Sequence, residues 1–84
     1  MRRITYVVLI QPVIDKNSVL RHYKAYCEAL PECTAYGTSF QEAEEKFRRN
    51  MADYLYGLQT AGQDLPRQRV SVKFIYYDPD DFMQ

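Results

Sequence analysis

Four short runs of the chain have the composition or the apolar–polar alternation of β-strands, which predicts strands there. The first run, Ile4 to Ile10, is rich in β-branched and aromatic residues and is bounded by Pro12, which is typical of a strand well inside a sheet. Residues 20–28 alternate more loosely after a turn cluster at 15–18. We expect these two runs to form a hairpin with a rather long loop.

Two further strands follow from the same pattern. Pro31 cannot donate to a strand ladder and breaks the second strand, so residues 34–36 resume as a short third strand that ends at Gly37. The run 70–77 alternates clearly and is stopped by the acidic segment 78–81, which predicts a fourth strand. One side of this fourth strand carries Val70, Val72, Phe74 and Tyr76.

Between the third and fourth strands, apolar residues recur every three or four positions, which predicts one long helix. Ser39 and Glu42 form a capping-box pattern, in which the Ser hydroxyl accepts a free amide and Glu42 reaches back to Ser39. Gly62 suits a left-handed cap at the other end, and Pro66 follows as a stop. The apolar stripe consists of Phe40, Ala43, Phe47, Met51, Tyr54, Leu55 and Leu58.

These elements predict an α+β fold in the order β-β-β-α-β, a two-layer sandwich with a mostly antiparallel sheet and the helix on one face. The 84 residues form one domain, 1–84, with a core at about 4–77 and an acidic tail at 78–84. Eight Tyr and four Phe are more than one helix can cover. The uncovered sheet face is therefore either a partner surface or a solvated tyrosine face.

Composition excludes several function classes. Eleven basic and eleven acidic residues give a net charge of zero, which removes the basic patch of a nucleic-acid binder. The longest apolar run, Tyr6 to Ile10, is far shorter than the roughly 20 residues of a membrane span. Met1 leads directly into a strand-like run without a signal peptide, so we expect a cytoplasmic protein.

Candidate catalytic or metal-binding residues are sparse. Cys27 and Cys33 match neither a zinc nor a redox spacing, and we expect them to be packed side chains. His22, the only histidine, has no evident carboxylate and nucleophile beside it, so we expect a surface strand residue. The acidic residues 78–81 lack the spread and the glycine of a calcium loop. We expect no enzymatic activity, no cofactor and no metal.

The turn at 29–33, the helix start at 37–43 and the segment 55–66 resemble the HicB-like family, which includes the antitoxins of HicA/HicB toxin–antitoxin pairs. The resemblance implies the same β-β-β-α-β order. Two departures are local: residues 11–18 lack the short glycine-rich hairpin loop, and Glu32 replaces a common glycine. The positions that carry the resemblance are Leu30, Pro31, Cys33, Gly37, Ser39, Glu42, Ala43, Gly62 and Pro66.

The resemblance implies a binding protein that neutralises a small HicA-like mRNA-cleaving toxin by direct contact. Full-length antitoxins of this type also carry a C-terminal DNA-binding segment, and we expect none after Tyr77. The alternative is a homo-oligomeric interaction module of the same fold with an unrelated partner and no toxin.

We expect a homodimer or homotetramer, because so small and aromatic a domain leaves an apolar patch. The helix pair Glu44 and Arg48 is either a structural i,i+4 pair or a toxin contact. The last strand is our preferred contact element if it lies at a sheet edge. The candidate partner or oligomer contacts are Val70, Val72, Phe74, Tyr76, Glu44 and Arg48.

Overall fold

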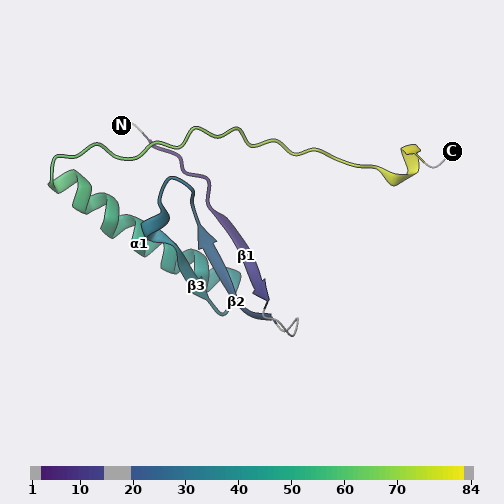
Figure 1. The fold of residues 1–84 in the computed structure, drawn as a ribbon, viewed down its shortest axis with the longest axis horizontal. Helices are drawn as coiled ribbons and strands as arrows, with labels where there is room; N and C mark the ends of the chain where they lie inside the picture. Colours follow the sequence, from purple (N-terminus) through teal and green to yellow (C-terminus); the bar gives the residue numbers. More distant parts are fainter. Residues whose placement is uncertain (1–2, 15–19, 83–84) are drawn as a thin grey trace.

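The computed structural model describes residues 3–14 and 20–82 and shows a small antiparallel sheet crossed by one long helix (Figure 1). The sheet has the order β1-β2-β3, and both neighbouring pairs are antiparallel. The predicted α+β class is confirmed, and so is the order β-β-β-α of the three strands and the long helix. The elements are β1 (Leu9–Ile14), β2 (Leu20–Tyr26), η1 (Pro31–Cys33), β3 (Ala35–Gly37), α1 (Phe40–Thr60) and η2 (Pro79–Phe82), where η denotes a short 3-10 helix.

Strand β1 is shifted along the chain from its predicted position at 4–10. It begins at Leu9 and continues through Pro12, which the sequence pattern had suggested as a boundary. Proline is tolerated because β1 lies at the edge of the sheet and pairs only with β2 among the described residues. Tyr6 and Val8 are nevertheless partly buried against the core. The predicted turn at 15–18 lies outside the described residues.

The prediction of a fourth strand at residues 70–77 is wrong. Within the described part of the chain, no strand includes residues 70–77, and every one of these residues is exposed. Figure 1 shows this segment leaving the body of the molecule as an extended chain. A strand without a neighbouring strand has no ladder to stabilise it, so the alternating pattern alone does not produce one here.

The N-terminus of α1 is capped by two side chains. The backbone N–H of Glu42 donates to the Ser39 Oγ over 3.0 Å, as predicted. The Glu42 carboxylate, however, accepts from the backbone N–H of Thr38 over 3.0 Å, one residue before the predicted partner Ser39. This hydrogen bond is the largest cause that lowers the pKa of Glu42.

The C-terminus of α1 ends in the predicted glycine cap. Gly62 has a φ of +73°, a left-handed conformation that glycine adopts without a Cβ clash. Its N–H donates to the Gln59 carbonyl over 3.0 Å, and the N–H of Gln63 donates to the Leu58 carbonyl over 2.9 Å. These two hydrogen bonds form a Schellman motif, which satisfies the last carbonyls of the helix.

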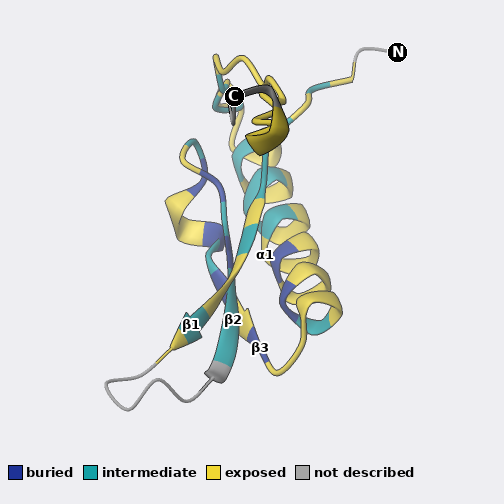
Figure 2. Cartoon of the chain, turned by 90° about the vertical axis from the view of Figure 1, so that its right-hand side faces the viewer, coloured by how far each residue is buried: buried dark blue, intermediate teal, exposed yellow. Residues whose placement is uncertain are grey.

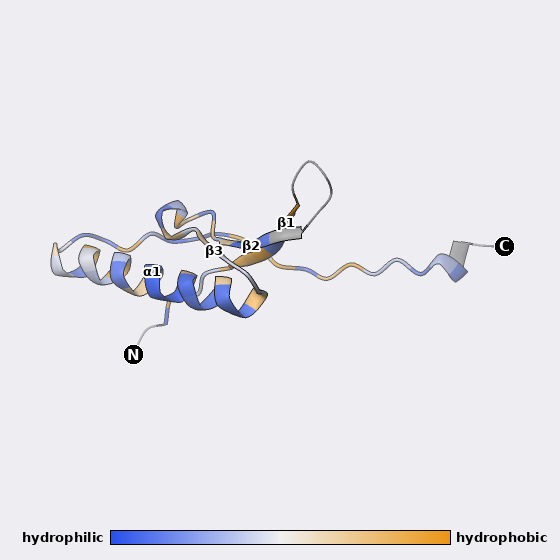
Figure 3. Ribbon diagram, turned by 90° about the horizontal axis from the view of Figure 1, so that it is seen from below, coloured by the Kyte–Doolittle hydropathy of each residue, from blue (hydrophilic) through white to orange (hydrophobic). Residues whose placement is uncertain are grey.

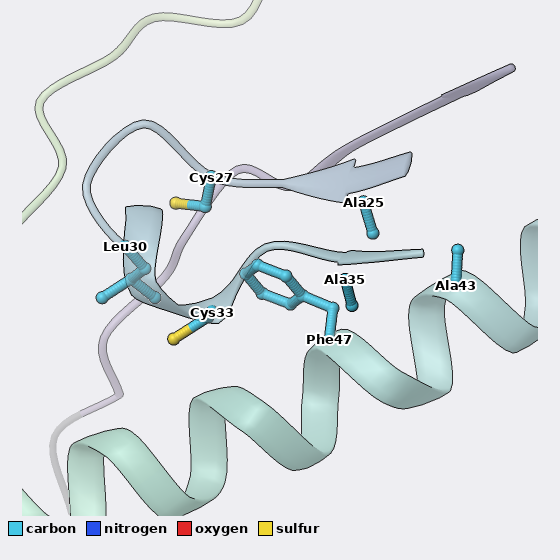
Figure 4. Close-up of a cluster of buried hydrophobic side chains, with 7 residues drawn as sticks. All are labelled: Ala25, Cys27, Leu30, Cys33, Ala35, Ala43 and Phe47. Carbon is cyan, nitrogen blue, oxygen red and sulfur yellow. The ribbon is translucent and has the colours of Figure 1, made fainter. Parts of the chain in front are cut away.

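The core lies between α1 and the face of the sheet that carries Ala25 and Ala35, and it includes the loop around η1 (Figure 4). Figure 2 shows the buried residues gathered in this layer, while the outer side of α1 is exposed. Gly37 lets β3 approach the helix, because a Cβ there would lie 2.5 Å from the Ala43 nitrogen. The buried residues are Ala25, Cys27, Leu30, Cys33, Ala35, Ala43 and Phe47.

Candidate functional site

The most exposed apolar surface is the segment 70–77, which we call the arm. Phe74 is 81% exposed, and Ile75 and Tyr76 are each 90% exposed, far beyond what a packed strand would show. Figure 3 shows apolar positions recurring along this segment as it leaves the body. Val70, Val72 and Tyr77 are also exposed. Large apolar side chains gathered on one exposed segment are typical of a surface that binds another protein.

The base of the arm is fixed to the stretch of chain before β1. The Tyr6 hydroxyl donates to the Pro66 carbonyl over 2.5 Å, and the backbone N–H of Val7 donates to the Gln68 Oε1 over 2.6 Å. Gln68 Oε1 also accepts from the thiol of Cys27 over 3.5 Å. The sequence pattern does not identify Gln68 as a contact residue, because a Gln between two Arg residues is typical of a solvated loop.

A groove lies beside β1 on the helix side of the sheet and has a volume of about 380 Å³. Alternate residues before and within β1 line one wall, and α1 provides the other. Its lining is mostly apolar, with one acidic and one basic residue. The lining residues are Ile4, Tyr6, Val8, Ile10, Glu44, Phe47, Arg48 and Met51.

A second hollow, of about 490 Å³, lies on the other side of β1. Val7 and Leu9 line it together with Tyr26 of β2, and Val70 and Val72 at the start of the arm close it. The outer edge of β1 therefore has apolar hollows on both sides, one facing α1 and one facing away from it. Such an edge suits an added strand that is apolar on both faces.

The face of the sheet away from α1 carries the aromatic residues that the sequence left uncovered. The rings of His22 and Tyr36 meet edge to face at 5.3 Å, and the Lys24 ammonium lies 5.0 Å from the Tyr26 ring centre. Tyr36 is exposed, whereas His22 and Tyr26 are partly buried. These contacts give His22 a packing role on the strand.

The predicted helix charges form local pairs. Arg48 Nε donates to Glu44 Oε2 over 2.9 Å, which confirms the i,i+4 pair. Lys46 lies 3.5 Å from Glu42 in a second pair of the same spacing. Both pairs are exposed, so each contributes little to stability. The structure places Glu44 and Arg48 in the lining of the groove, whereas Phe74 and Tyr76 of the arm are not part of it.

The residues of the turn and helix start form one packed unit. Leu30 and Cys33 are fully buried, and Asn50 of α1 donates to the Cys33 carbonyl over 3.2 Å. Burial raises the pKa of the Cys33 thiol, and the neighbouring Glu32 raises it further. A thiol that stays protonated is a poor nucleophile. Cys27 and Cys33 are both buried, as expected for packed side chains.

Within the described part of the chain, no cluster of three or more His, Cys, Asp or Glu side chains could hold a metal ion. Among residues 3–14 and 20–82, no helix combines the length and the apolar character needed to cross a bilayer.

Comparison with known proteins finds no matching family model, no matching curated protein and no matching solved structure. The resemblance to the HicB-like family therefore rests on the motif residues alone and stays a prediction.

Proposed function

We propose that this protein is a cytoplasmic, antitoxin-type binding protein that neutralises a small HicA-like mRNA-cleaving toxin by direct contact. The resemblance at the turn and helix start supports this function. Of the residues that carry the resemblance, Leu30 and Cys33 are buried and Ser39 caps α1. The protein contributes contact and shape, and no chemistry of its own.

The observation that carries the binding role is the exposure of the arm. Most of the side-chain surface of Phe74, Ile75 and Tyr76 is exposed to solvent in the single chain. Covering such side chains stabilises a complex by about 1.5–3 kcal/mol for each one that becomes fully buried. A protein that works as part of a complex accounts for this segment.

The toxin contact that we propose is the outer face of α1. A toxin that cleaves mRNA must bind phosphate groups and therefore carries a basic surface. Glu45 and Asp53 are exposed on this face, and the exposed Arg49 lies one turn from each of them. Acidic side chains at these positions favour the approach of a basic partner.

Co-expression with a HicA-like toxin from the neighbouring reading frame tests this function. We expect the protein to restore growth and to co-purify with the toxin. The charge reversal Glu45→Lys with Asp53→Lys should weaken the complex by more than about tenfold. The matched control is Asp64→Lys with Asp80→Lys, which makes the same change in net charge away from this face and should leave binding intact. A neighbour that is not toxic, or the absence of a complex, would overturn the proposal.

A second function is a homo-oligomeric interaction module with an unrelated partner and no toxin. One observation favours it: a single chain presents both the apolar arm and an open, apolar strand edge. The identity of the gene beside this one distinguishes the two functions, because only the first requires a toxin.

A further inference from the structure

We infer that the arm of each molecule binds along the outer edge of β1 in a second copy of this chain, so that two copies exchange arms. The inference goes beyond the proposed function, because it assigns the arm to self-association and leaves the outer face of α1 to the toxin. It begins from the position of β1, whose only strand partner in the described chain is β2.

The edge of β1 fits a strand of the arm's composition. The groove on its helix side presents Val8 and Ile10, and the hollow on its other side presents Leu9. The arm is apolar on both faces near its end, since Phe74 and Tyr76 alternate with Ile75. A strand added here would bury side chains on both sides of the sheet.

The base of the arm shows that this edge accepts polar contacts from the segment that follows α1. The N–H of Val7 already donates to Gln68 across the edge. Because the Val7 N–H is already bonded and Pro12 has no N–H, we place the new pairing mainly on residues 8–11.

A second copy fits better than an unrelated protein, because it satisfies both exposed surfaces of the chain at once. An unrelated partner on the arm would leave the groove on the helix side of β1 open. Two copies related by a two-fold axis place each arm on the other's edge, and the assembly closes. The arm can also keep the outstretched direction that it has in the single chain (Figure 1).

Cross-linking between two different variants, each with one added cysteine, tests the exchange. One chain carries Gln11→Cys at the edge of β1, and the other carries Lys73→Cys, Phe74→Cys or Ile75→Cys in the arm. The native Cys27 and Cys33 are buried and should not react. The two chains are unfolded together, refolded and treated with a short bis-maleimide. We expect a linked pair for at least one arm position, and none when wild type replaces either variant.

Sedimentation velocity at micromolar concentration gives the second readout. Wild type should sediment as a dimer of twice the 10.0 kDa chain. Phe74→Asp with Tyr76→Asp should raise the dimer dissociation constant by more than about tenfold. Both side chains are exposed in the single chain, so the helical circular dichroism signal of α1 should be unchanged. The matched control Gln59→Asp with Thr60→Asp, on exposed residues at the end of α1, should remain a dimer.

Three results would overturn the exchange. A wild-type monomer, with a link formed only when both cysteines are in one chain, would show that the arm folds back on its own edge. A link between two Phe74→Cys chains without one to Gln11→Cys would show that arms pair with each other. A dimer that survives the double Asp variant would place the interface elsewhere. Loss of toxin binding in any of these variants is a separate result, because the toxin assay uses α1.

Discussion

At the scale of single residues, the start of α1 depends on one carboxylate. Glu42 accepts from the N–H and the hydroxyl of Thr38, and Lys46 lies one turn further along the helix. Both contacts favour the ionised form, and they lower the pKa of Glu42. The negative charge also lies in the first turn, where it interacts favourably with the helix dipole.

The lowered pKa of Glu42 makes stability depend on pH. A carboxylate with a depressed folded pKa stabilises the fold above its unfolded pKa, and this contribution is lost as the pH falls through the folded pKa. We expect the free energy of unfolding to fall as the pH drops below about 4.5, the ordinary pKa of a Glu carboxyl, and to fall less in Glu42→Gln. Urea unfolding at several pH values measures this difference.

Glu45→Gln is the matched control for the pH dependence. It removes another acid of the first turns, one that accepts from the Gln41 amide over 3.2 Å. The control should retain the pH dependence of wild type. Equal slopes for Glu42→Gln and wild type would show that the Thr38 contact does not stabilise the ionised carboxylate.

At the scale of elements, Gly37 determines how closely β3 approaches α1. An added Cβ at Gly37 would lie 2.5 Å from the Ala43 nitrogen and 2.9 Å from the Glu42 carbonyl carbon. Both are backbone atoms of the helix start, so the strand and the helix would have to move apart. Gly57, by contrast, has no atom within 4 Å of a Cβ and lies in the interior of α1.

The two glycines should therefore respond in opposite directions to the same substitution. Gly37→Ala should lower the free energy of unfolding by about 1–3 kcal/mol through overpacking. Gly57→Ala should raise it by about 0.5–1 kcal/mol, because alanine is the better helix former. Chemical denaturation of both variants measures the difference. A neutral Gly37→Ala would contradict the close approach of β3 to the helix.

The elements that the sequence predicts well are those determined by local chemistry. Ser39 and Gly62 signal the two ends of α1, and the spacing of Ala43 and Phe47 identifies its buried side. The predicted end of β1 fell short of Ile14 because Pro12 is typical of a strand boundary, whereas an edge strand tolerates it. That edge position depends on the order of strands in the sheet, which no local pattern contains.

The candidate site was predictable in its residues but not in its arrangement. Val70, Val72, Phe74 and Tyr76 were identified from their alternation, and they form the exposed arm. Whether such a run joins a sheet depends on a neighbour far away in the sequence. The contact of Gln68 with Val7, sixty-one residues apart, has no local signal for the same reason.

At the scale of the whole molecule, the arm makes the chain elongated. The radius of gyration is 17.1 Å, and the longest dimension is 60 Å. A compact domain of this length has a radius of gyration of about 12 Å. The excess comes from a segment whose side chains are mostly apolar, so the single chain leaves unburied the surface that a complex would cover.

Hydrogen–deuterium exchange across the arm tests most directly the claim that a second protein molecule covers it. We measure the full-length chain over a wide range of concentrations. Protection of the amides in 70–77 should rise with concentration, together with protection of 8–11. Exchange at the rate of an unstructured peptide at every concentration would contradict the account, and so would protection that does not depend on concentration.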